Sequence, residues 1–316
     1  MSAIKLSVCI VNWNTKDLLR NCLHSLFKNV GIKNFEVLVV DNNSQDSSVN
    51  MIQREFPNVK LIINKQNVGY AKANNQMLKI AQGEYALLLN SDTIVLDNSI
   101  PTLINFMDNH PQAGACGPRL LNEDLTFQRS FMKFPTLLYE LKYHLKYHFP
   151  PFNKMFKYLV NYKQVVDRQA KINSPIEVDA IPGACFLIRM KTYKDVGPMG
   201  EDYFLYSEEN DWCWRMKQKG WKIYYVPSAA IIHLGGQSTK KAGDMVKIYN
   251  FYLSRYIFFK KYKNKSCIVL RALHIFFFTW FFISQKIICF FKKSKVSILK
   301  SRILLYKKLI VLFLKG

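Results

Sequence analysis

The 316-residue sequence lacks several patterns that identify common classes of protein. Its seven cysteines form no C-x-x-C pair and no metal-finger spacing, so we expect buried free thiols in a reducing compartment. No glycine lies between Val11 and Asp17, which excludes the G-x-G-x-x-G fingerprint of a dinucleotide-binding oxidoreductase. The N-terminal residues include no long apolar segment. We therefore expect no secretory signal and a catalytic part that stays in the cytoplasm.

Acidic residues are scarce, with 22 Asp and Glu against 45 Lys and Arg, which gives a formal net charge of +23. The excess is concentrated in two segments: residues 240–316 carry +17 and residues 127–172 carry +7, and the remainder is close to neutral. The basic segments are interleaved with Phe and Ile, as in segments that contact membranes. We therefore expect a membrane surface as a partner and no nucleic acid.

The first 120 residues alternate between strand-like and helix-like patterns. Short apolar runs predict strands and 3.6-residue periodicity predicts helices, so the order indicates an α/β fold with a mostly parallel sheet covered by helices. The expected strands are 6–11, 35–40, 61–64 and 85–89, and the expected helices are 17–30 and 71–81. Ligands of such sheets bind outside the carboxyl ends of the strands. The polar residues that follow the strands, and that we expect at one edge, are Asn12, Asn14, Asp41, Asn43, Ser44, Asn67 and Asp92.

The second half of the sequence has a weaker pattern. We expect a partly helical insertion at 127–172, a strand pair or strand-turn at 177–190 and a helix at about 208–220. A strand at 222–226 then leads to 230–233. These elements complete an expected domain at 1–240.

Residues 241–316 form an expected membrane-associating helical tail. Its apolar run has 14 residues without a charge between Arg271 and Lys286. A helix of that length is about 21 Å long, which is short of the ~30 Å hydrocarbon core. Residues 267–285 could just cross a bilayer if Arg271 extended to the interface, and a buried soluble helix is a further alternative. We favour helices that lie in the membrane surface, because aromatic clusters alternate with lysines.

Two residues are candidates for binding a cation. Asp92 directly follows a buried strand in L-L-L-N-S-D-T, and Mg²⁺ or Mn²⁺ prefers such hard oxygen ligands together with substrate phosphates. His233 precedes Gly-Gly and Ser-Thr, as in a loop that contacts phosphates. The structural alternatives are an aspartate that caps a turn and a histidine that only packs.

Three carboxylates lie within four residues at the start of the helix expected at 208–220: Glu208, Glu209 and Asp211. Favourable interaction with the helix dipole would explain them without any function. Mutual repulsion, and burial beside the neighbouring tryptophans, would instead raise at least one pKa towards the range of a general base.

Taken in order, the motifs resemble glycosyltransferase family 2, in its bacterial rhamnosyltransferase-like branch. The resemblance covers about residues 5–240. It rests on the segments V-N-W-N (11–14), D-N-N-S-Q-D-S-S (41–48), N-V-G-Y-A-K-A-N-N (67–75), L-N-S-D-T (89–93), V-D-A-I-P-G-A-C-F-L-I-R (178–189), F-L-Y-S-E-E-N-D-W-C-W-R (204–215) and H-L-G-G-Q-S-T (233–239).

The resemblance implies a GT-A fold, an inverting transfer and a set of site residues. Asp92 matches the last acid of the family's D-x-D metal motif, with His233 as a further ligand, while Asn90 replaces the first acid. Glu209 falls at the position of the catalytic base, and Asp211 is the alternative, with Glu208 beside them. The positions implied to bind the nucleotide sugar are Asn12, Asn14, Asp41, Asn43, Asn67, Gly69, Asn74, Asn90, Gly183 and Ala184.

The resemblance also implies partners and a location. The expected donor is dTDP-rhamnose or a UDP-sugar, with Mg²⁺ or Mn²⁺ as cofactor. The expected acceptor is a glycan or polyprenyl-linked glycan of a bacterial surface polysaccharide. The expected site of action is the cytoplasmic face of the plasma membrane, with peripheral or monotopic attachment. The alternatives are a family 2 enzyme with a UDP-hexose donor and an inactive membrane-associated scaffold that binds nucleotide sugars.

Overall fold

A computed structural model describes residues 3–148, 162–235, 244–291 and 296–315 of the chain. The chain divides into two compact units. The first unit comprises Met1–Phe134 and Lys163–Lys241, and the second comprises Pro135–Tyr162 and Ala242–Gly316. Part of the expected insertion at 127–172 therefore groups with the C-terminal helices.

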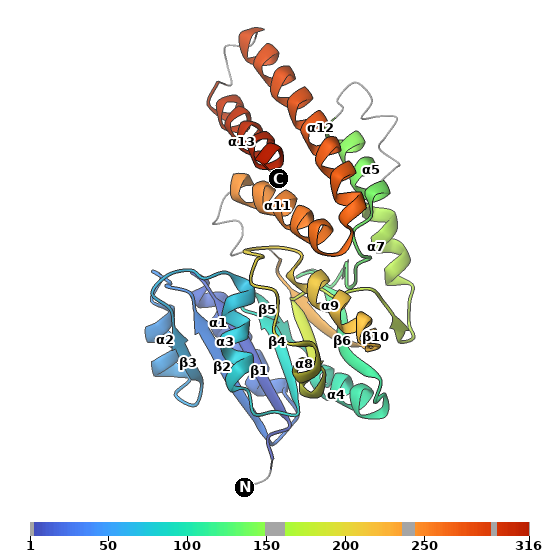
Figure 1. Cartoon of the computed structure of the whole chain (residues 1–316). Coiled ribbons are helices and arrows are strands. Elements are labelled where there is room, and N and C mark those ends of the chain that lie inside the picture. Colours follow the sequence, from blue (N-terminus) through green and yellow to red (C-terminus); the bar gives the residue numbers. More distant parts are fainter. Residues whose placement is uncertain (1–2, 149–161, 236–243, 292–295, 316) are drawn as a thin grey trace. The chain divides into compact units, whose positions relative to one another are not determined.

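The described residues of the first unit include ten strands that form one mixed sheet (Figure 1). The main path runs in the order β3-β2-β1-β4-β9-β6-β10-β5, with β7 paired to β6 and β8 paired to β10. The strands are β1 (Leu6–Asn12), β2 (Phe35–Asp41), β3 (Lys60–Ile63), β4 (Tyr85–Asn90), β5 (Thr93–Val95), β6 (Ala113–Leu121), β7 (Phe127–Gln128), β8 (Ile176–Glu177), β9 (Cys185–Arg189) and β10 (Lys222–His233).

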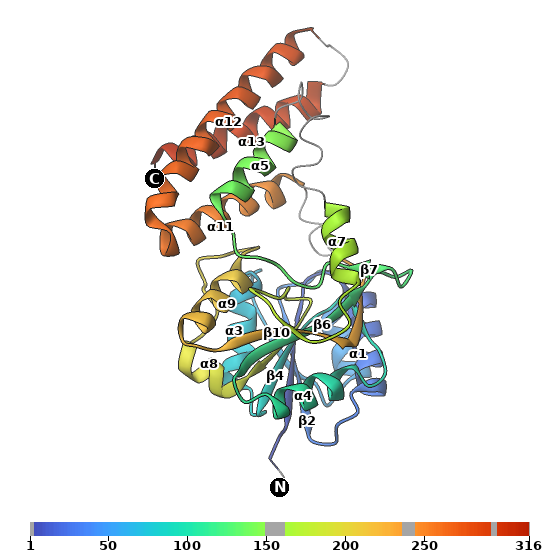
Figure 2. The same ribbon diagram turned by 90° about the vertical axis from the view of Figure 1, so that its right-hand side faces the viewer.

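Helices cover both faces of this sheet (Figures 1 and 2). Buried residues of α1, α2 and α4 pack on one face, and buried residues of α3, α8 and α9 pack on the other. The first-unit helices are α1 (Lys16–Asn29), α2 (Ser48–Glu55), α3 (Tyr70–Ile80), α4 (Ser99–Asn109), α7 (Tyr162–Ala170), α8 (Met190–Val196) and α9 (Glu208–Gln218). Residue Tyr162 of α7 belongs to the second unit by the division above.

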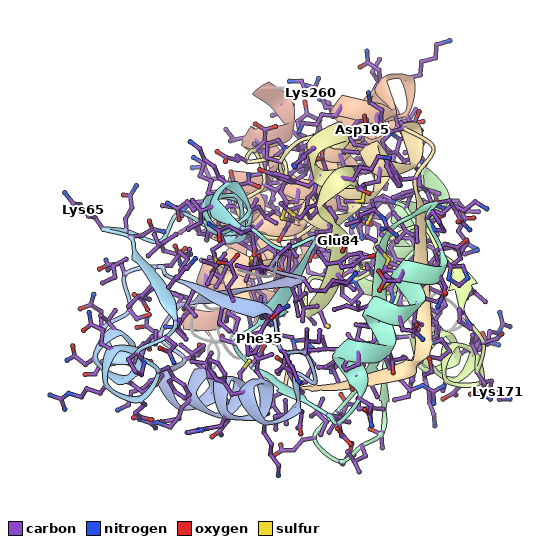
Figure 3. All side chains as sticks on the ribbon, turned by 90° about the horizontal axis from the view of Figure 1, so that it is seen from below. Phe35, Lys65, Glu84, Lys171, Asp195 and Lys260 are labelled. Carbon is purple, nitrogen blue, oxygen red and sulfur yellow. The ribbon has the colours of Figure 1, made fainter. Side chains whose placement is uncertain are left out.

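Strand residues alternate between the two faces because successive side chains point to opposite sides of a strand. In β4, Leu87 and Leu89 contact the α1 side while Ala86 and Leu88 contact the α3 side. Both faces are apolar, which explains why the strands appear in the sequence as continuous apolar runs. Side chains fill the space around the sheet, and Lys65, just beyond β3, points outwards (Figure 3).

The predicted α/β fold class is confirmed, and the expected strands and helices of the first 90 residues agree with the structure within one residue at each boundary. The strands β1, β2, β3 and β4 are parallel, so their carboxyl ends lie at one edge. Asn12 and Asp41 are opposite each other there, and Val11 is opposite Asn90.

Two expectations for the second half need correction. Of the two alternatives for 177–190, the strand pair is wrong, because β8 pairs with β10 whereas β9 is antiparallel to both β4 and β6, and a turn at 183–184 leads into β9. The segments 222–226 and 230–233 belong to one continuous strand, β10, whose register against β6 shifts between Val226 and Ala230. These pairings join residues that are distant in the sequence, and local periodicity does not report them.

The second unit is helical. Its described helices are α5 (Leu137–His148), α11 (Asp244–Tyr262), α12 (Asn264–Phe291) and α13 (Val296–Lys315). Apolar side chains of α11, α12 and α13 form its interior, including Phe258, Phe278, Leu309 and Phe313. Among the described residues, one helical segment, Asn264–Ile287, is long and apolar enough to cross a membrane, with a mean hydropathy of 1.9. A core helix of a soluble protein passes the same criterion.

Replacing Leu87 by alanine tests the position of β4 in the core of the first unit. Leu87 is fully buried, so the Leu87→Ala variant should lose about 3 kcal/mol of unfolding free energy through lost burial and the cavity left behind. Urea denaturation followed by circular dichroism measures the change. Ile80→Ala is the matched control, because Ile80 is 46% exposed and should cost less than about 0.5 kcal/mol. Equal losses in the two variants would contradict the assignment of β4 to the core.

Candidate functional site

The carboxyl ends of β1 and β2 are joined by a buried hydrogen-bond network around Asp41. Asn12 Nδ2 donates to Asp41 Oδ2 at 2.7 Å, and the backbone N–H of Ser44 donates to Asp41 Oδ1 at 2.8 Å. Thr15 Oγ1 donates to Asn12 Oδ1 at 2.6 Å and lies 2.8 Å from Ser91 Oγ, just past β4. The network therefore fixes the ends of three neighbouring strands against one another.

The loops beyond these strands adopt left-handed backbone conformations at Asn14 (φ 56°) and Asn43 (φ 65°), which asparagine tolerates better than most residues. Asn14 Oδ1 accepts from the backbone of Gln45 at 2.7 Å, and Asn43 is exposed. The adjacent Asn42 is the buried residue, and it donates to the backbone oxygen of Gly69 at 3.5 Å. The sequence pattern had not singled out Asn42.

The segment 67–74 leads into α3 and covers its first turn, with close backbone contacts at Gly69. Asn67 Oδ1 accepts from the Gly69 backbone at 3.0 Å. Gly69 has φ 85°, and a Cβ there would lie 3.0 Å from the backbone oxygen of Phe204, so the position requires glycine. Asn74 is buried, and its Nδ2 donates to the backbone oxygen of Tyr70 at 3.0 Å.

The two candidate metal ligands lie side by side. The antiparallel pairing of β5 with β10 places His233 opposite Thr93. The backbone N–H of Leu234 donates to the backbone oxygen of Asp92 at 2.9 Å. His233 Nε2 lies 3.3 Å from Asp92 Oδ1, and both side chains are largely buried. The amide of Asn90 lies 3.4 Å from the same His233 nitrogen. The expected phosphate-contacting residues 236–239 lie outside the described residues.

Gln128 of β7 orients the imidazole of His233. The Gln128 Nε2 atom donates to the backbone oxygen of His233 at 3.1 Å and to Asn122 Oδ1 at 2.9 Å, which leaves its Oε1 as an acceptor. That Oε1 lies 2.7 Å from His233 Nδ1, so Nδ1 carries a proton and donates it. In the neutral imidazole the lone pair of Nε2 then faces Asp92, as a metal-ligating histidine requires. No motif in the sequence points to Gln128.

This donor set suits one face of a hard divalent cation. It offers one carboxylate and one oriented imidazole, with the Asn90 amide beside them. Within the described ranges, no group of three or more His, Cys, Asp or Glu side chains could hold a metal by itself. Phosphate oxygens of a substrate would have to complete the coordination, as is common for Mg²⁺ and Mn²⁺.

Glu209 lies at the start of α9 and is hydrogen-bonded to the loop before β9. Its Oε1 accepts from the Gly183 backbone at 2.9 Å, and Tyr70 donates its hydroxyl to the Gly183 oxygen at 2.9 Å. A Cβ at residue 183 would lie 2.5 Å from the Tyr70 hydroxyl and 2.6 Å from Glu209 Oε1, so this contact requires glycine. The backbone oxygen of Ala184 accepts from Asn90 at 3.0 Å, which ties the same loop to the end of β4.

Burial raises the pKa of Glu209 above its ordinary value. Burial and the charge of Glu209 raise the pKa of Glu208 further, and Glu208 Oε2 has no hydrogen-bond partner within the described part of the chain. The pKa of the Tyr70 hydroxyl is raised by burial and by these two carboxylates, so the phenol stays protonated and keeps its bond to Gly183.

Asp211 has a different environment. Its side chain is 1% exposed, and its Oδ2 pairs with Arg215 Nε at 2.9 Å while Oδ1 accepts from the Tyr203 hydroxyl at 3.2 Å. Arg215 also donates to the backbone oxygens of Val196 and Pro198. Asp211 therefore links α9 to the segment that follows α8, and these contacts favour a structural role for it.

Comparison of the sequence with known families gives a direct match. The sequence model of Glycosyl transferase family 2 matches residues 7–171. An N-acetylglucosaminyl-diphospho-decaprenol L-rhamnosyltransferase of Mycobacterium tuberculosis is 31% identical over 216 residues, covering 64% of this chain and 67% of the relative. A dTDP-rhamnosyl transferase, RfbF, of Shigella flexneri is 24% identical over 303 residues, covering 93% of this chain and 92% of the relative.

Solved structures support the fold. The mannosyltransferase PcManGT from Pyrobaculum calidifontis, solved with GDP-Man and Mn²⁺, superposes with a TM-score of 0.57 at 13% identity and covers 100% of this chain and 87% of its own. GalNAc-T7, solved with UDP, GalNAc and Mn²⁺, gives a TM-score of 0.54 at 18% identity and covers 73% of this chain. This chain spans 44% of the length of GalNAc-T7.

Neutralising Asp211 should lower stability. The Asp211→Asn variant breaks a buried ion pair with Arg215 and should lose about 3 kcal/mol of unfolding free energy, measured by thermal denaturation. Asp17→Asn is the matched control, because Asp17 pairs with Arg20 but is 80% exposed and should cost about 0.5 kcal/mol or less. A fully stable Asp211→Asn protein would contradict the structural role.

Proposed function

The chain belongs to glycosyltransferase family 2, and from this membership we propose that it is an inverting, metal-dependent enzyme with a nucleoside-diphosphate sugar as donor. One observation carries the proposal. A chain of contacts runs from Glu209 through the loop 183–184 to Asn90, His233 and Asp92. It brings a carboxylate of raised pKa and an oriented Asp–His pair to the same edge of the sheet.

Glu209 is the proposed general base. It removes the proton of the acceptor hydroxyl as that oxygen attacks the anomeric carbon, in a single displacement that inverts the configuration. Its partly buried position favours proton uptake, and the Gly183 N–H and the Tyr70 bond to Gly183 hold it in place. Asp211 is the weaker candidate, because Arg215 and Tyr203 already engage both of its oxygens.

Asp92 and His233 are the proposed ligands of Mg²⁺ or Mn²⁺. A bound cation offsets the negative charge that builds up on the departing nucleoside diphosphate. Gln128 keeps the His233 lone pair directed at the cation position, and Asn90 lies beside it. The proposed nucleoside pocket lies at the ends of β1 and β2, where Asn12, Asn14, Asp41 and Asn67 line the edge.

The relatives suggest the substrates. A rhamnosyl donor is favoured because relatives are an L-rhamnosyltransferase and a dTDP-rhamnosyl transferase. A polyprenyl-diphosphate-linked glycan is the favoured acceptor, because one of these relatives acts on a diphospho-decaprenol substrate. We accordingly propose that the enzyme works at the cytoplasmic face of the membrane, attached through residues 241–316.

Replacing Glu209 by glutamine tests the general base. The Glu209→Gln variant should lose at least about a hundredfold in turnover and keep its affinity for the donor, because the amide cannot accept the proton. Asp211→Asn, assayed at a temperature where it is folded, should retain most of its turnover. An active Glu209→Gln protein together with an inactive Asp211→Asn protein would move the base to Asp211.

The pH profile is part of the same test. Glu209 acts as its carboxylate, and its pKa is raised, so kcat/KM should fall as the pH decreases through a midpoint above the ordinary glutamate value of about 4.3. The activity that remains in Glu209→Gln should lack this acidic limb. A wild-type profile that is flat to about pH 4 would contradict a base of raised pKa.

A thermal-shift screen tests the donor and the metal together. With Mn²⁺ present, dTDP-rhamnose should raise the Tm of the protein more than UDP-glucose or GDP-mannose does, since a ligand at a hundred times its Kd adds about 2.7 kcal/mol. The shift should shrink when the metal is chelated. It should also shrink in His233→Ala and remain in His24→Ala, an exposed histidine of α1. Equal shifts with and without metal would contradict the proposed role of Asp92 and His233.

Catalytic turnover distinguishes an enzyme from an inactive scaffold. Metal-dependent release of the nucleoside diphosphate from the preferred donor would exclude the scaffold. Donor binding with no release, in the presence of any polyprenyl-linked acceptor tested, would favour it.

A further inference from the structure

Helix α12 of the second unit exposes a continuous apolar stripe. The α12 stripe consists of Ile268, Val269, Phe276, Trp280, Ile283 and Ile287. At 100° per residue these six positions fall within an arc of about 120°. They are large and well exposed: Ile268 is 72% accessible, Phe276 59% and Trp280 43%. Contiguous apolar surface of this kind marks a site of interaction.

The opposite face of α12 is already occupied within the second unit. His274 and Phe278 are fully buried, and His274 meets the ring of Phe313 of α13 edge to face, with ring centroids 4.5 Å apart. Arg271 turns away from the stripe and donates to the backbone oxygen of Phe313 at 2.9 Å. The α12 stripe therefore lies on the side of the helix away from these buried contacts, and its six side chains are 43–72% exposed.

The charges around the stripe indicate its partner. Lys265 and Lys286 lie near its two ends, and no acidic residue occurs in the sequence from 245 to 316. An anionic lipid surface offers an apolar interior for the stripe and negative headgroups for the lysines. We propose that the α12 stripe is the surface through which the second unit binds an anionic membrane, with α12 lying in the plane of that membrane.

The neighbouring helix α13 explains why α12 does not cross the bilayer. Tyr306 of α13 lies 4.9 Å from Phe281, ring to ring, and Phe313 lies level with His274. The exposed Lys307 and Lys308 are thus level with the middle of α12. If α12 spanned the bilayer, both ammonium groups would lie near its centre, where charged side chains are strongly disfavoured. When α12 lies flat, the lysines can remain in the headgroup region or in water.

This inference names the surface used for the membrane attachment in the proposed function, and in that respect it rests on that proposal. Its test needs no donor or acceptor. Binding to vesicles is measured without substrate, so a failure here leaves the transferase assays unaffected, and an inactive enzyme that binds vesicles leaves this inference intact.

The experiment compares co-sedimentation of the full chain with vesicles. Wild-type protein should bind an equimolar mixture of phosphatidylglycerol and phosphatidylcholine and bind pure phosphatidylcholine much more weakly. The double variant Phe276→Asp/Ile283→Asp should bind the anionic vesicles at least about tenfold more weakly, because both side chains are exposed in the folded unit and would enter the lipid. Circular dichroism checks that the variant is folded.

The matched control is Ile63→Asp/Ile80→Asp, which adds the same two charges at exposed isoleucines of the first unit and should bind vesicles like the wild type. Unchanged binding by the stripe variant would overturn the proposal. A stripe variant that binds vesicles normally but loses self-association in sedimentation would assign the stripe to a second copy of the chain. Retention of the wild-type protein in cell membranes after alkaline carbonate washing would overturn the in-plane orientation, because a surface-bound helix is released.

Discussion

The arrangement of the site depends on a short antiparallel pairing between β5 and β10. Only three residue pairs join these strands, yet the pairing places His233 beside Asp92. Gln128, which holds the imidazole, is placed by the separate pairing of β7 with β6. The sheet makes this possible because β10 also pairs in parallel with β6, which continues to β9 and β4. The pairing of β10 with β5 thus brings His233 next to Asp92, although the two residues are far apart in the sequence. The hydrogen bond between His233 Nδ1 and Gln128 Oε1 then orients the ring, so that Nε2 faces Asp92.

The three acidic residues at the start of α9 illustrate how environment separates side chains of similar chemistry. Asp211 pairs with Arg215 of the same helix and accepts from Tyr203 in the segment after α8. Glu209 points towards the strand ends and bonds to the backbone of Gly183. Glu208 is buried, and its raised pKa favours the neutral acid. Burial disfavours the ionised form of an acid, whereas a cationic partner favours it, so the same turn of helix provides a candidate base and a structural ion pair.

The helical unit holds polar groups in its own apolar interior. Glu140 is fully buried 3.6 Å from Arg255, and burial raises its pKa while Arg255 opposes the rise. His144 stacks between the rings of Tyr252 and Phe277. Such groups restrict the ways in which amphipathic helices can pack, because each must remain beside its neighbours. The buried face of α12 is itself mostly apolar, so α12 has apolar side chains both in the interior of the unit and in the exposed stripe.

The sequence by itself determined the α/β fold class, the resemblance to the family, and four strands and two helices of the first 90 residues within one residue, although it did not predict α2. These properties are local or ordered along the chain: apolar runs give strands, and the polar residues that end them, such as Asp41 and Asp92, follow directly. It could not determine which strands of the second half pair, the contact of Gln128 with His233, the different surroundings of Glu209 and Asp211, or the face of α12 that stays exposed. Each of these depends on contacts between residues far apart in the chain. Only the tertiary structure brings those residues together and thereby fixes their hydrogen bonds, charges and burial.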